Sequence, residues 1–332
     1  MRLLIGLVRL GIGLGTAGVS LLALLALLGF ASPVLDLFNH AQVFLLGGTL
    51  VAFVLVLLLF RGRWRSWLAG IGAAGLLASA VTVMPEAISS FAPRPPLPAE
   101  ERPVLTLMTH NLFGMNYEME RVAALITEED PDFVVLQEYF PEQSGELHPL
   151  LRERYPHYAR CRGGKRANLG LYAKLPFEEA SDDGSCPDDA YGSQRTARII
   201  GSFVLTDGTP LTVMTTHLDW PVPVARQVEQ FADLGAAVRA VEGPLVLAGD
   251  FNSTPWSYAL RGFAERAGLV RETRNLATFP NRFLIRRMFE TLPFLPLDHV
   301  FSTGGVAVHE VWAGADTGSD HLPVFARFTV EP

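Results

Sequence analysis

Residues 244–257 read PLVLAGDFNSTPWS, an apolar run that ends in a polar cluster. The apolar part, 245–248, is typical of a strand whose two faces are both buried. Asp250 and Asn252 follow it two residues apart, so an extended backbone points them to the same side, and Gly249 lets another segment approach closely. An aspartate placed there can orient or deprotonate a water molecule while the amide holds an oxygen of a substrate. The stretch therefore predicts a catalytic site at the end of a central strand.

Short apolar runs that end in polar residues recur through residues 104–330, with amphipathic stretches between them. They predict strands at 104–109, 133–137, 170–173, 199–205, 211–216, 245–248, 299–302, 306–312 and 324–330. A helical period predicts helices at 118–129, 141–154, 224–241 and 256–267. Several of the strands are apolar throughout, which indicates that both faces of their sheets are covered. We therefore expect an α/β layered domain with central sheets and outer helices.

Polar groups gather where these strands begin or end, the position at which sites in such folds form. They are Asn111, Glu138, His217, Asp250 with Asn252, Asp298, and Asp320 with His321. Taken singly, each has an ordinary structural explanation, such as a helix cap for Glu138 or a solvated side chain for His217. Taken together, they are rich in oxygen donors, and this favours Mg²⁺ or Mn²⁺ over zinc. The chain has no HExxH, paired CxxC, P-loop or GxSxG motif, which excludes several other enzyme classes.

In these residues and their order, the chain resembles the endonuclease/exonuclease/phosphatase superfamily, especially its deoxyribonuclease and sphingomyelinase branches, as a membrane-anchored, bacterial-type member. The motifs that carry the resemblance are THNLFG, VVLQEY, VMTTHLDWP, GDFN, PLDHV and GSDHLP, spread over about residues 104–330. The resemblance implies a four-layer α/β sandwich of two packed mixed sheets flanked by helices. It also implies hydrolysis of phosphoesters with a divalent metal.

Matching the motifs residue by residue implies a metal site. Glu138 would be the main metal ligand, Asn111 would assist it, and Asp320 would bind or organise a metal. The chain departs from the abasic-site branch, which has an acidic residue where this chain has Phe113 and a tyrosine where it has His217. Abasic-site repair is therefore disfavoured.

The same matching implies the catalytic roles. Asp250 would activate the attacking water, Asn252 would bond a phosphoryl oxygen, and His321 would stabilise the pentacoordinate transition state. Asp298 would hold that histidine in position, and His217 would contact the phosphate. Less directly, Arg195 in SQRTARII matches a phosphate-facing arginine of the deoxyribonuclease branch.

The chain before this domain is apolar, and 49% of the whole sequence is hydrophobic while only 18% is charged. The runs 10–35, 37–60 and 66–85 contain no Asp, Glu, Lys or Arg, and each exceeds the roughly 18 residues that span a bilayer core. They predict three transmembrane helices in a membrane anchor at residues 1–91. The first run is too long for the core of a signal peptide, and two more spans follow it.

Basic residues fix the expected orientation of this anchor. Arg2 and Arg9 precede the first span and 61–65 reads RGRWR, whereas the loop 31–41 contains no lysine or arginine. The positive-inside rule then places the N-terminus in the cytoplasm and the later domain on the extracytoplasmic side of the cytoplasmic (inner) membrane. In such an oxidising compartment Cys161 and Cys186 can form a disulfide, with two buried free thiols as the alternative.

Residues 92–103, APRPPLPAEERP, predict a semi-rigid linker to a catalytic domain at 104–332. The chain carries a net charge of −7, which argues mildly against a protein that coats long nucleic acid. Four acidic residues of the 181–192 stretch, Asp182, Asp183, Asp188 and Asp189, predict a solvated loop rather than a calcium site. Two basic stretches form alternative substrate rims or plain surface, namely Arg160, Arg162, Lys165 and Arg166, and Arg282, Arg286 and Arg287.

The sequence thus predicts a membrane-anchored, metal-dependent phosphodiesterase that acts by in-line attack of water. Its partners would be the lipid bilayer and a phosphoester substrate, either nucleic acid or a phospholipid or sphingolipid headgroup. No protein partner can be inferred. The alternative is a membrane-tethered binding protein that keeps the fold without catalysis.

Overall fold

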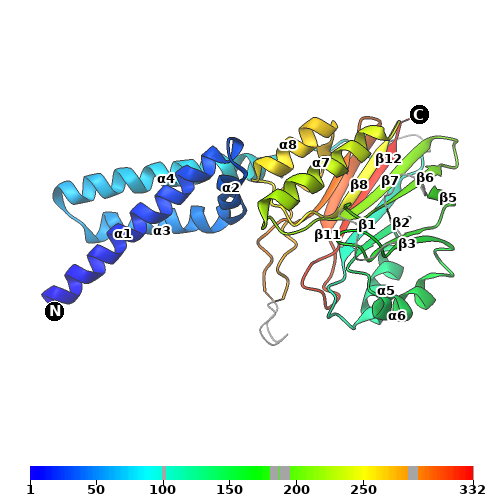
Figure 1. The fold of residues 1–332 in the computed structure, drawn as a ribbon, viewed down its shortest axis with the longest axis horizontal. Helices are drawn as coiled ribbons and strands as arrows, with labels where there is room; N and C mark the ends of the chain where they lie inside the picture. The colour runs from blue at the N-terminus through cyan, green and yellow to red at the C-terminus, as the bar shows by residue number, and fades with distance from the viewer. Residues whose placement is uncertain (99–101, 180–185, 187–194, 283–290, 332) are drawn as a thin grey trace. The chain divides into compact units, whose positions relative to one another are not determined.

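The computed structural model describes the 332-residue chain except for residues 99–101, 180–185, 187–194, 283–290 and 332, and the side chain of Arg2 (Figure 1). The chain divides into two compact units. Unit 1 consists of Met1–Ala92 together with Thr254–Arg261, and unit 2 consists of Pro93–Ser253 and Gly262–Pro332. Asp182, Asp183, Asp188 and Asp189 of the predicted acidic loop, and Arg286 and Arg287 of one predicted rim, lie outside the described residues.

Unit 1 contains the three predicted apolar helices. Its long helices are α1 (Arg2–Ala26), α3 (Gln42–Leu59) and α4 (Gly62–Ser89), and the short helix α2 (Pro33–Asp36) lies between α1 and α3. Including the adjoining turns, three segments are long and apolar enough to cross a membrane: Leu3–Phe30, Pro33–Leu59 and Gly62–Ser89. They support a membrane anchor, while the membrane type and the orientation stay predictions.

The carboxylate of Asp36 is buried inside unit 1. Its oxygens accept hydrogen bonds from the backbone N–H groups of Tyr258 and Ala259, both at 2.9 Å, and from the hydroxyl of Ser257 at 3.0 Å. Tyr258 and Ala259 begin helix α8 (Tyr258–Ala267), whose first N–H groups have no partner within the helix. Asp36 therefore caps α8 from a segment more than 200 residues earlier in the chain.

Unit 2 is built on two six-stranded mixed sheets. The first has the order β11-β12-β1-β2-β4-β3 and the second has the order β5-β6-β7-β8-β10-β9 (Figure 1). The strands of the first sheet are β1 (Leu105–Asn111), β2 (Phe133–Gln137), β3 (His157–Cys161), β4 (Leu169–Ala173), β11 (Val306–Ala313) and β12 (Val324–Val330). Those of the second are β5 (Phe177–Glu179), β6 (Arg198–Val204), β7 (Pro210–His217), β8 (Leu245–Asp250), β9 (Val270–Arg271) and β10 (Asp298–Ser302).

The two sheets pack face to face over an apolar core and carry helices on their outer faces. The rings of Phe133 in β2 and Phe203 in β6 meet across the core with centroids 4.8 Å apart. Helices α5 (Met119–Glu129) and α6 (Pro141–Leu151) share a second apolar cluster with the first sheet. On the second sheet, Phe231 of α7 (Val224–Ala240) stacks near Phe263, which contacts Phe301 of β10. This is the α/β sandwich that the sequence led us to expect.

The strands that the sequence did not predict are the edge strands β3, β5 and β9. A strand at the edge of a sheet is short or partly exposed, so it lacks the continuous apolar run of a central strand. The central strands begin and end within two residues of their predicted ranges. Helix α6 ends at Leu151 instead of 154, and α8 starts at Tyr258 instead of 256.

Two features tie irregular segments to unit 2. Arg94 of the proline-rich segment donates a hydrogen bond to the Glu272 carboxylate at 2.9 Å, and the carbonyl of Pro95 lies 3.0 Å from a ring nitrogen of His309. Cys161, at the end of β3, and Cys186 are joined by a disulfide with their Cα atoms 5.4 Å apart. The first feature fastens the proline-rich segment to unit 2, and the second fastens Cys186 to strand β3.

Candidate active site

The site is organised around the end of strand β8. Asp250 is the last residue of β8, and it stands in register with His217 of the parallel strand β7 and with Asp298 of the antiparallel strand β10. The strands on the two sides therefore deliver an imidazole and a carboxylate to the same row as Asp250. Gly249 is required beside it, because a Cβ atom there would lie 2.1 Å from the carbonyl oxygen of Thr216.

Asp250 is buried and is held by two asparagines. Its carboxylate accepts hydrogen bonds from the backbone N–H of Asn252 at 2.8 Å and from the side-chain amide of Asn111, in the other sheet, at 3.0 Å. Burial raises its pKa to about 7, although the nearby His321 opposes this shift. A carboxyl group with such a pKa can take up a proton near neutral pH, as a general base must.

Asn252 adopts a left-handed backbone conformation, with φ of 46°. Its amide nitrogen donates to the carbonyl of Leu218 at 2.9 Å and lies 3.2 Å from Nε2 of His217. Its Oδ1 atom is buried without a hydrogen-bond partner among the described residues. An unpaired buried polar atom is costly, so this oxygen is free to receive a donor from a ligand or a water molecule.

His321 and Asp298 form a buried acid–base pair. Nδ1 of His321 lies 2.8 Å from Oδ2 of Asp298, which also accepts a hydrogen bond from Thr278 at 2.5 Å. Burial by itself lowers the pKa of His321, but the charges of Asp298 and Asp250 outweigh it and raise the pKa to about 10. The pKa of Asp298 is lowered because His321 outweighs the effect of burial. His321 is therefore a cation, with Nε2 3.9 Å from Oδ2 of Asp250.

His217 differs from His321 in charge. Its Nε2 atom lies 3.4 Å from Oδ2 of Asp250, but burial, with the charge of Arg166, lowers its pKa to about 3. His217 is therefore neutral at physiological pH and interacts through hydrogen bonds rather than through charge. The two histidines whose Nε2 atoms lie near Oδ2 of Asp250 are thus suited to different roles.

The predicted metal ligands lie at the ends of β1 and β2 and in the loop before β12. Glu138 has φ of 53° and accepts a hydrogen bond from the backbone N–H of Gly114 at 2.7 Å. Asp320 follows Ser319, whose hydroxyl donates to the carbonyl of Asn111 at 2.7 Å and so ties this loop to β1. Burial and the charge of Glu138 raise the pKa of Asp320 to about 6. The carboxyl groups of Glu138 and Asp320 repel each other, and a bound cation would relieve this repulsion. With the amide oxygen of Asn111 they form a set of oxygen donors that suits a hard divalent cation.

A second group of possible metal-ligating atoms lies around Asp250 itself. One ligand atom each from Asp250, Asp298 and His321 falls within 4.8 Å of the others. Because Nδ1 of His321 is bonded to Asp298 and the ring is protonated, this imidazole has no lone pair to offer a metal. The carboxylates of Asp250 and Asp298 are the donors that remain in this group.

Two side chains near His321 escaped the sequence reasoning. The ring of Phe279 lies 4.8 Å from the ring of His321, and Trp220 contacts Phe279 with ring centroids 5.8 Å apart. Trp220 is 43% exposed. In the sequence, only the position of Trp220, three residues after His217, indicates that its ring lies near the site. Phe279 and Trp220 form an aromatic wall beside His321.

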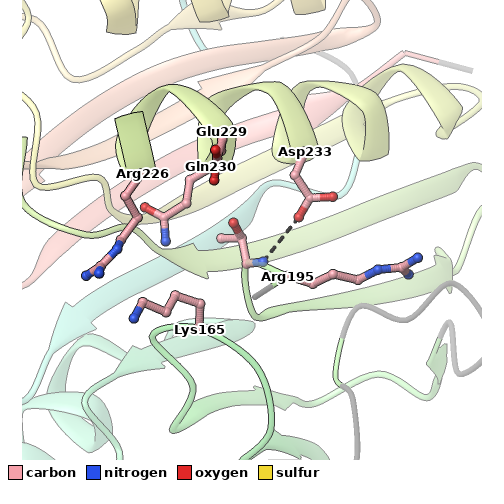
Figure 2. A pocket seen from close by; sticks show the side chains of 7 residues that line it. Lys165, Arg195, Arg226, Glu229, Gln230 and Asp233 are labelled. Atoms are coloured by element: carbon pink, nitrogen blue, oxygen red, sulfur yellow. Dashed lines mark hydrogen bonds between the residues drawn. The ribbon is translucent and has the colours of Figure 1, made fainter. Parts of the chain in front are cut away.

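The structure separates Arg195 from the catalytic cluster. Arg195 lines a different hollow of about 310 Å³ between helix α7 and the loop that contains Lys165 (Figure 2). Three other predicted basic side chains have partners of their own. Arg160 stacks on the ring of Tyr139, Arg166 pairs with Asp219, and Arg282 pairs with Asp316.

A model of the Endonuclease/Exonuclease/phosphatase family matches residues 108–321, which contain every residue of this cluster. The chain belongs to this family. Membership supports a phosphoesterase, since the family is named for nucleases and phosphatases. Among curated relatives, a UPF0294 protein of Vibrio vulnificus strain CMCP6 is 34% identical over 137 residues, which cover 40% of this chain and 44% of that protein. The chain thus matches less than half the length of this relative.

Solved structures of the family share the fold of unit 2. A family member from Bacteroides thetaiotaomicron has a TM-score of 0.55 at 19% identity and covers 70% of this chain and 100% of its own. A mannosyl-6-phosphatase of the same species has a TM-score of 0.51 at 19% identity, covering 68% and 99%. D. rerio TDP2, solved with a single-strand DNA product, has a TM-score of 0.52 at 16% identity, covering 68% and 99%.

Proposed function

We propose that the protein is a metal-dependent phosphoric diester hydrolase, anchored in the cytoplasmic membrane with its catalytic unit on the extracytoplasmic side. The observation that carries the proposal is the convergence of groups on Asp250. Oδ2 of this buried carboxylate has the neutral imidazole of His217 3.4 Å away and the cationic imidazole of His321 3.9 Å away. Base, acid and phosphate-binding groups of this kind are what in-line displacement at phosphorus requires.

In this reaction the ionised form of Asp250 accepts a proton from the attacking water. The amides of Asn111 and Asn252 hold the carboxylate in place. His321, kept protonated by Asp298, donates a hydrogen bond to a phosphoryl oxygen as negative charge grows on it. His217 and Asn252 form the remaining wall and contact the phosphoryl group through neutral hydrogen bonds.

The residues present fit a divalent cation, because carboxylate and amide oxygens are the ligands that Mg²⁺ and Mn²⁺ prefer. Glu138, Asp320 and Asn111 would hold it. When bound, the cation supplies positive charge opposite the non-bridging and leaving oxygens.

The substrate class is nucleic acid or the headgroup of a phospholipid or sphingolipid. Three apolar helices support placement next to a bilayer, and the disulfide of Cys161 and Cys186 is consistent with an oxidising compartment. The aromatic wall supports a substrate with an apolar or planar portion, since Trp220 offers an exposed ring face close to the site.

The decisive experiment measures hydrolysis of bis-p-nitrophenyl phosphate by the purified full chain in detergent, with Mg²⁺ or Mn²⁺ and with a chelator. Asp250→Ala should lose nearly all activity. The substitution removes the general base and also the carboxylate to which Asn111 and Asn252 donate hydrogen bonds. Asp207→Ala is the matched control, since Asp207 is an exposed carboxylate at the turn that precedes β7, at the opposite end of the strand from His217. Equal rates for wild type and Asp250→Ala would instead favour a non-catalytic, membrane-tethered binding protein.

A further inference from the structure

A hollow outside the catalytic cluster presents unsatisfied donors beside positive charge. It lies between α7 and the loop before β4, and its walls include Lys165, Arg226 and Gln230 (Figure 2). Gln230 is only 2% exposed, and its Nε2 atom has no hydrogen-bond partner among the described residues. Thr196, 1% exposed, also leaves its hydroxyl without a partner in that part of the chain. Buried polar atoms without partners are rare in folded proteins.

The orientation of Gln230 is fixed by the protein. Its Oε1 atom accepts a hydrogen bond from the backbone N–H of Asp219 at 2.8 Å. The amide therefore turns its two N–H groups toward the hollow, where Figure 2 shows Arg226 beside it on the same helix and Lys165 on the loop that faces them. A buried N–H donor near an ammonium and a guanidinium is a setting that an anionic oxygen satisfies.

The acidic side chains around this hollow are largely neutralised. Asp233 accepts hydrogen bonds from Arg198 at 3.0 Å and from the backbone N–H of Thr196 at 3.2 Å. Asp219 pairs with Arg166 at 2.6 Å and, more loosely, with Arg226 at 3.6 Å. Glu229, exposed on α7, is the acidic group of the lining that remains at the rim. The cationic side chains therefore dominate the charge that an entering ligand meets.

The hollow is connected to the catalytic cluster by one short segment. His217 contacts Asp250, the carbonyl of Leu218 accepts from Asn252, and Asp219 binds Gln230. Residues 217–219 therefore contact the cluster around Asp250 at one end and, through Gln230, the lining of the hollow at the other.

We propose that this hollow binds a second anionic group of the substrate, next to the phosphoester that is cleaved. This inference rests on the proposed function, and it narrows the substrate to molecules with at least two phosphoryl groups. Such molecules are polynucleotides or lipids whose headgroup carries an extra phosphate. Cationic choline headgroups are disfavoured, because they would place a positive charge against Lys165 and Arg226.

The test compares two diesters that differ in one phosphate. Both carry a p-nitrophenyl ester on the 5′-phosphate of thymidine, and only the second carries an additional free phosphate on the 3′ oxygen. For the full chain in detergent, kcat/KM should be about tenfold higher for the second substrate than for the first, the size expected for a charge-assisted contact. Lys165→Gln and Arg226→Gln should each remove most of this preference while leaving hydrolysis of bis-p-nitrophenyl phosphate unchanged. Gln230→Glu keeps an oxygen that accepts from the backbone N–H of Asp219, but it replaces the N–H donors with a negatively charged acceptor. This variant should therefore abolish the preference.

Two variants serve as controls. Glu229→Gln removes the opposing charge and should increase the preference, whereas Arg239→Gln, an arginine near the other end of α7, should leave it unchanged. An unaltered preference in the Lys165, Arg226 and Gln230 variants, with hydrolysis intact, would overturn this inference alone. If wild type hydrolysed no phosphodiester, the proposed function would fail. Calorimetric titration with inorganic pyrophosphate would then still test the hollow, and equal binding by wild type and Gln230→Glu would refute it.

A second pair of substrates separates the two sources of such an anion. Vesicles that contain phosphatidylinositol 4-phosphate or phosphatidylinositol differ in one headgroup phosphate, as the two nucleotide esters do. A Lys165-dependent preference for the phosphorylated lipid alone would assign the site to a lipid headgroup. A preference for the bisphosphate nucleotide alone would assign it to nucleic acid.

Discussion

Nδ1 of His321 lies 2.8 Å from Oδ2 of Asp298, in a pair that is buried between β10 and the loop before β12. The two residues are 23 positions apart in the chain. The carboxylate keeps the imidazole protonated over a wide pH range and fixes its Nε2 atom toward Asp250. Together with the charge of Asp250, this pairing keeps His321 protonated, and Asp298 makes the larger contribution.

Asp298→Asn should lower kcat/KM by about 10²-fold, the lower range for a positioned acid. It should also move the basic limb of the pH profile from near 10 to lower pH, because the charge that raises the pKa of His321 is lost. Steady-state kinetics between pH 5 and 11 measures both effects. Asp316→Asn removes a carboxylate that pairs with Arg282, and this control should leave the basic limb in place.

The acidic limb should belong to Asp250. Because burial raises its pKa to about 7, activity should rise as the pH increases toward 7 and the carboxyl group loses its proton. A bound cation would move this limb to lower pH. Asp250→Asn should reduce kcat by about 10²- to 10⁴-fold. A profile whose acidic limb survives in a residually active Asp250→Asn variant would assign that limb to another group.

The His321 pair should also make stability depend on pH. The folded pKa of about 10 lies above the ordinary value of 6.5, so the folded state binds an extra proton between these values. The contribution is therefore complete below pH 6.5 and is lost as the pH rises toward 10. Urea unfolding of wild type and His321→Gln at pH 6 and pH 9.5 measures it. The difference between the two proteins should be smaller at the higher pH.

Glu138→Gln should weaken activation by Mg²⁺ or Mn²⁺ without unfolding the protein. The substitution keeps an acceptor for Gly114 but removes a charge that a divalent cation needs. We expect an increase of at least about tenfold in the metal concentration for half-maximal activity. Glu142→Gln, in the first turn of α6, is the matched control. Full activity of wild type in excess chelator would contradict the metal requirement.

Trp220→Ala should raise KM by about tenfold with little change in kcat, because the exposed ring contacts substrate away from the reacting phosphorus. Trp220→Phe should recover most of the loss. Val204→Ala, at another exposed apolar residue, in β6, should change neither constant. A fall in kcat alone would show instead that Trp220 acts by supporting Phe279 and His321.

The sequence determined the central strands, the apolar helices and most of the candidate residues that the structure brings together around Asp250. Continuous apolar runs identify strands that are buried on both faces, and GDFN with its companion motifs marks where those strands end. Local patterns of this kind depend only on neighbouring residues, so they can be read without the fold. Edge strands such as β3 were missed because their exposed side removes that pattern.

Tertiary structure decided which of these residues meet. Strand pairing places His217 and Asp298 on the two sides of Asp250, and sheet packing adds Asn111 from the other sheet, whereas Arg195 is placed in a separate hollow. The pKa values of His321 and His217, about 10 and about 3, could not follow from the sequence. They arise from burial and from charges a few ångströms away, and those distances are set by the packing of strands remote in the chain.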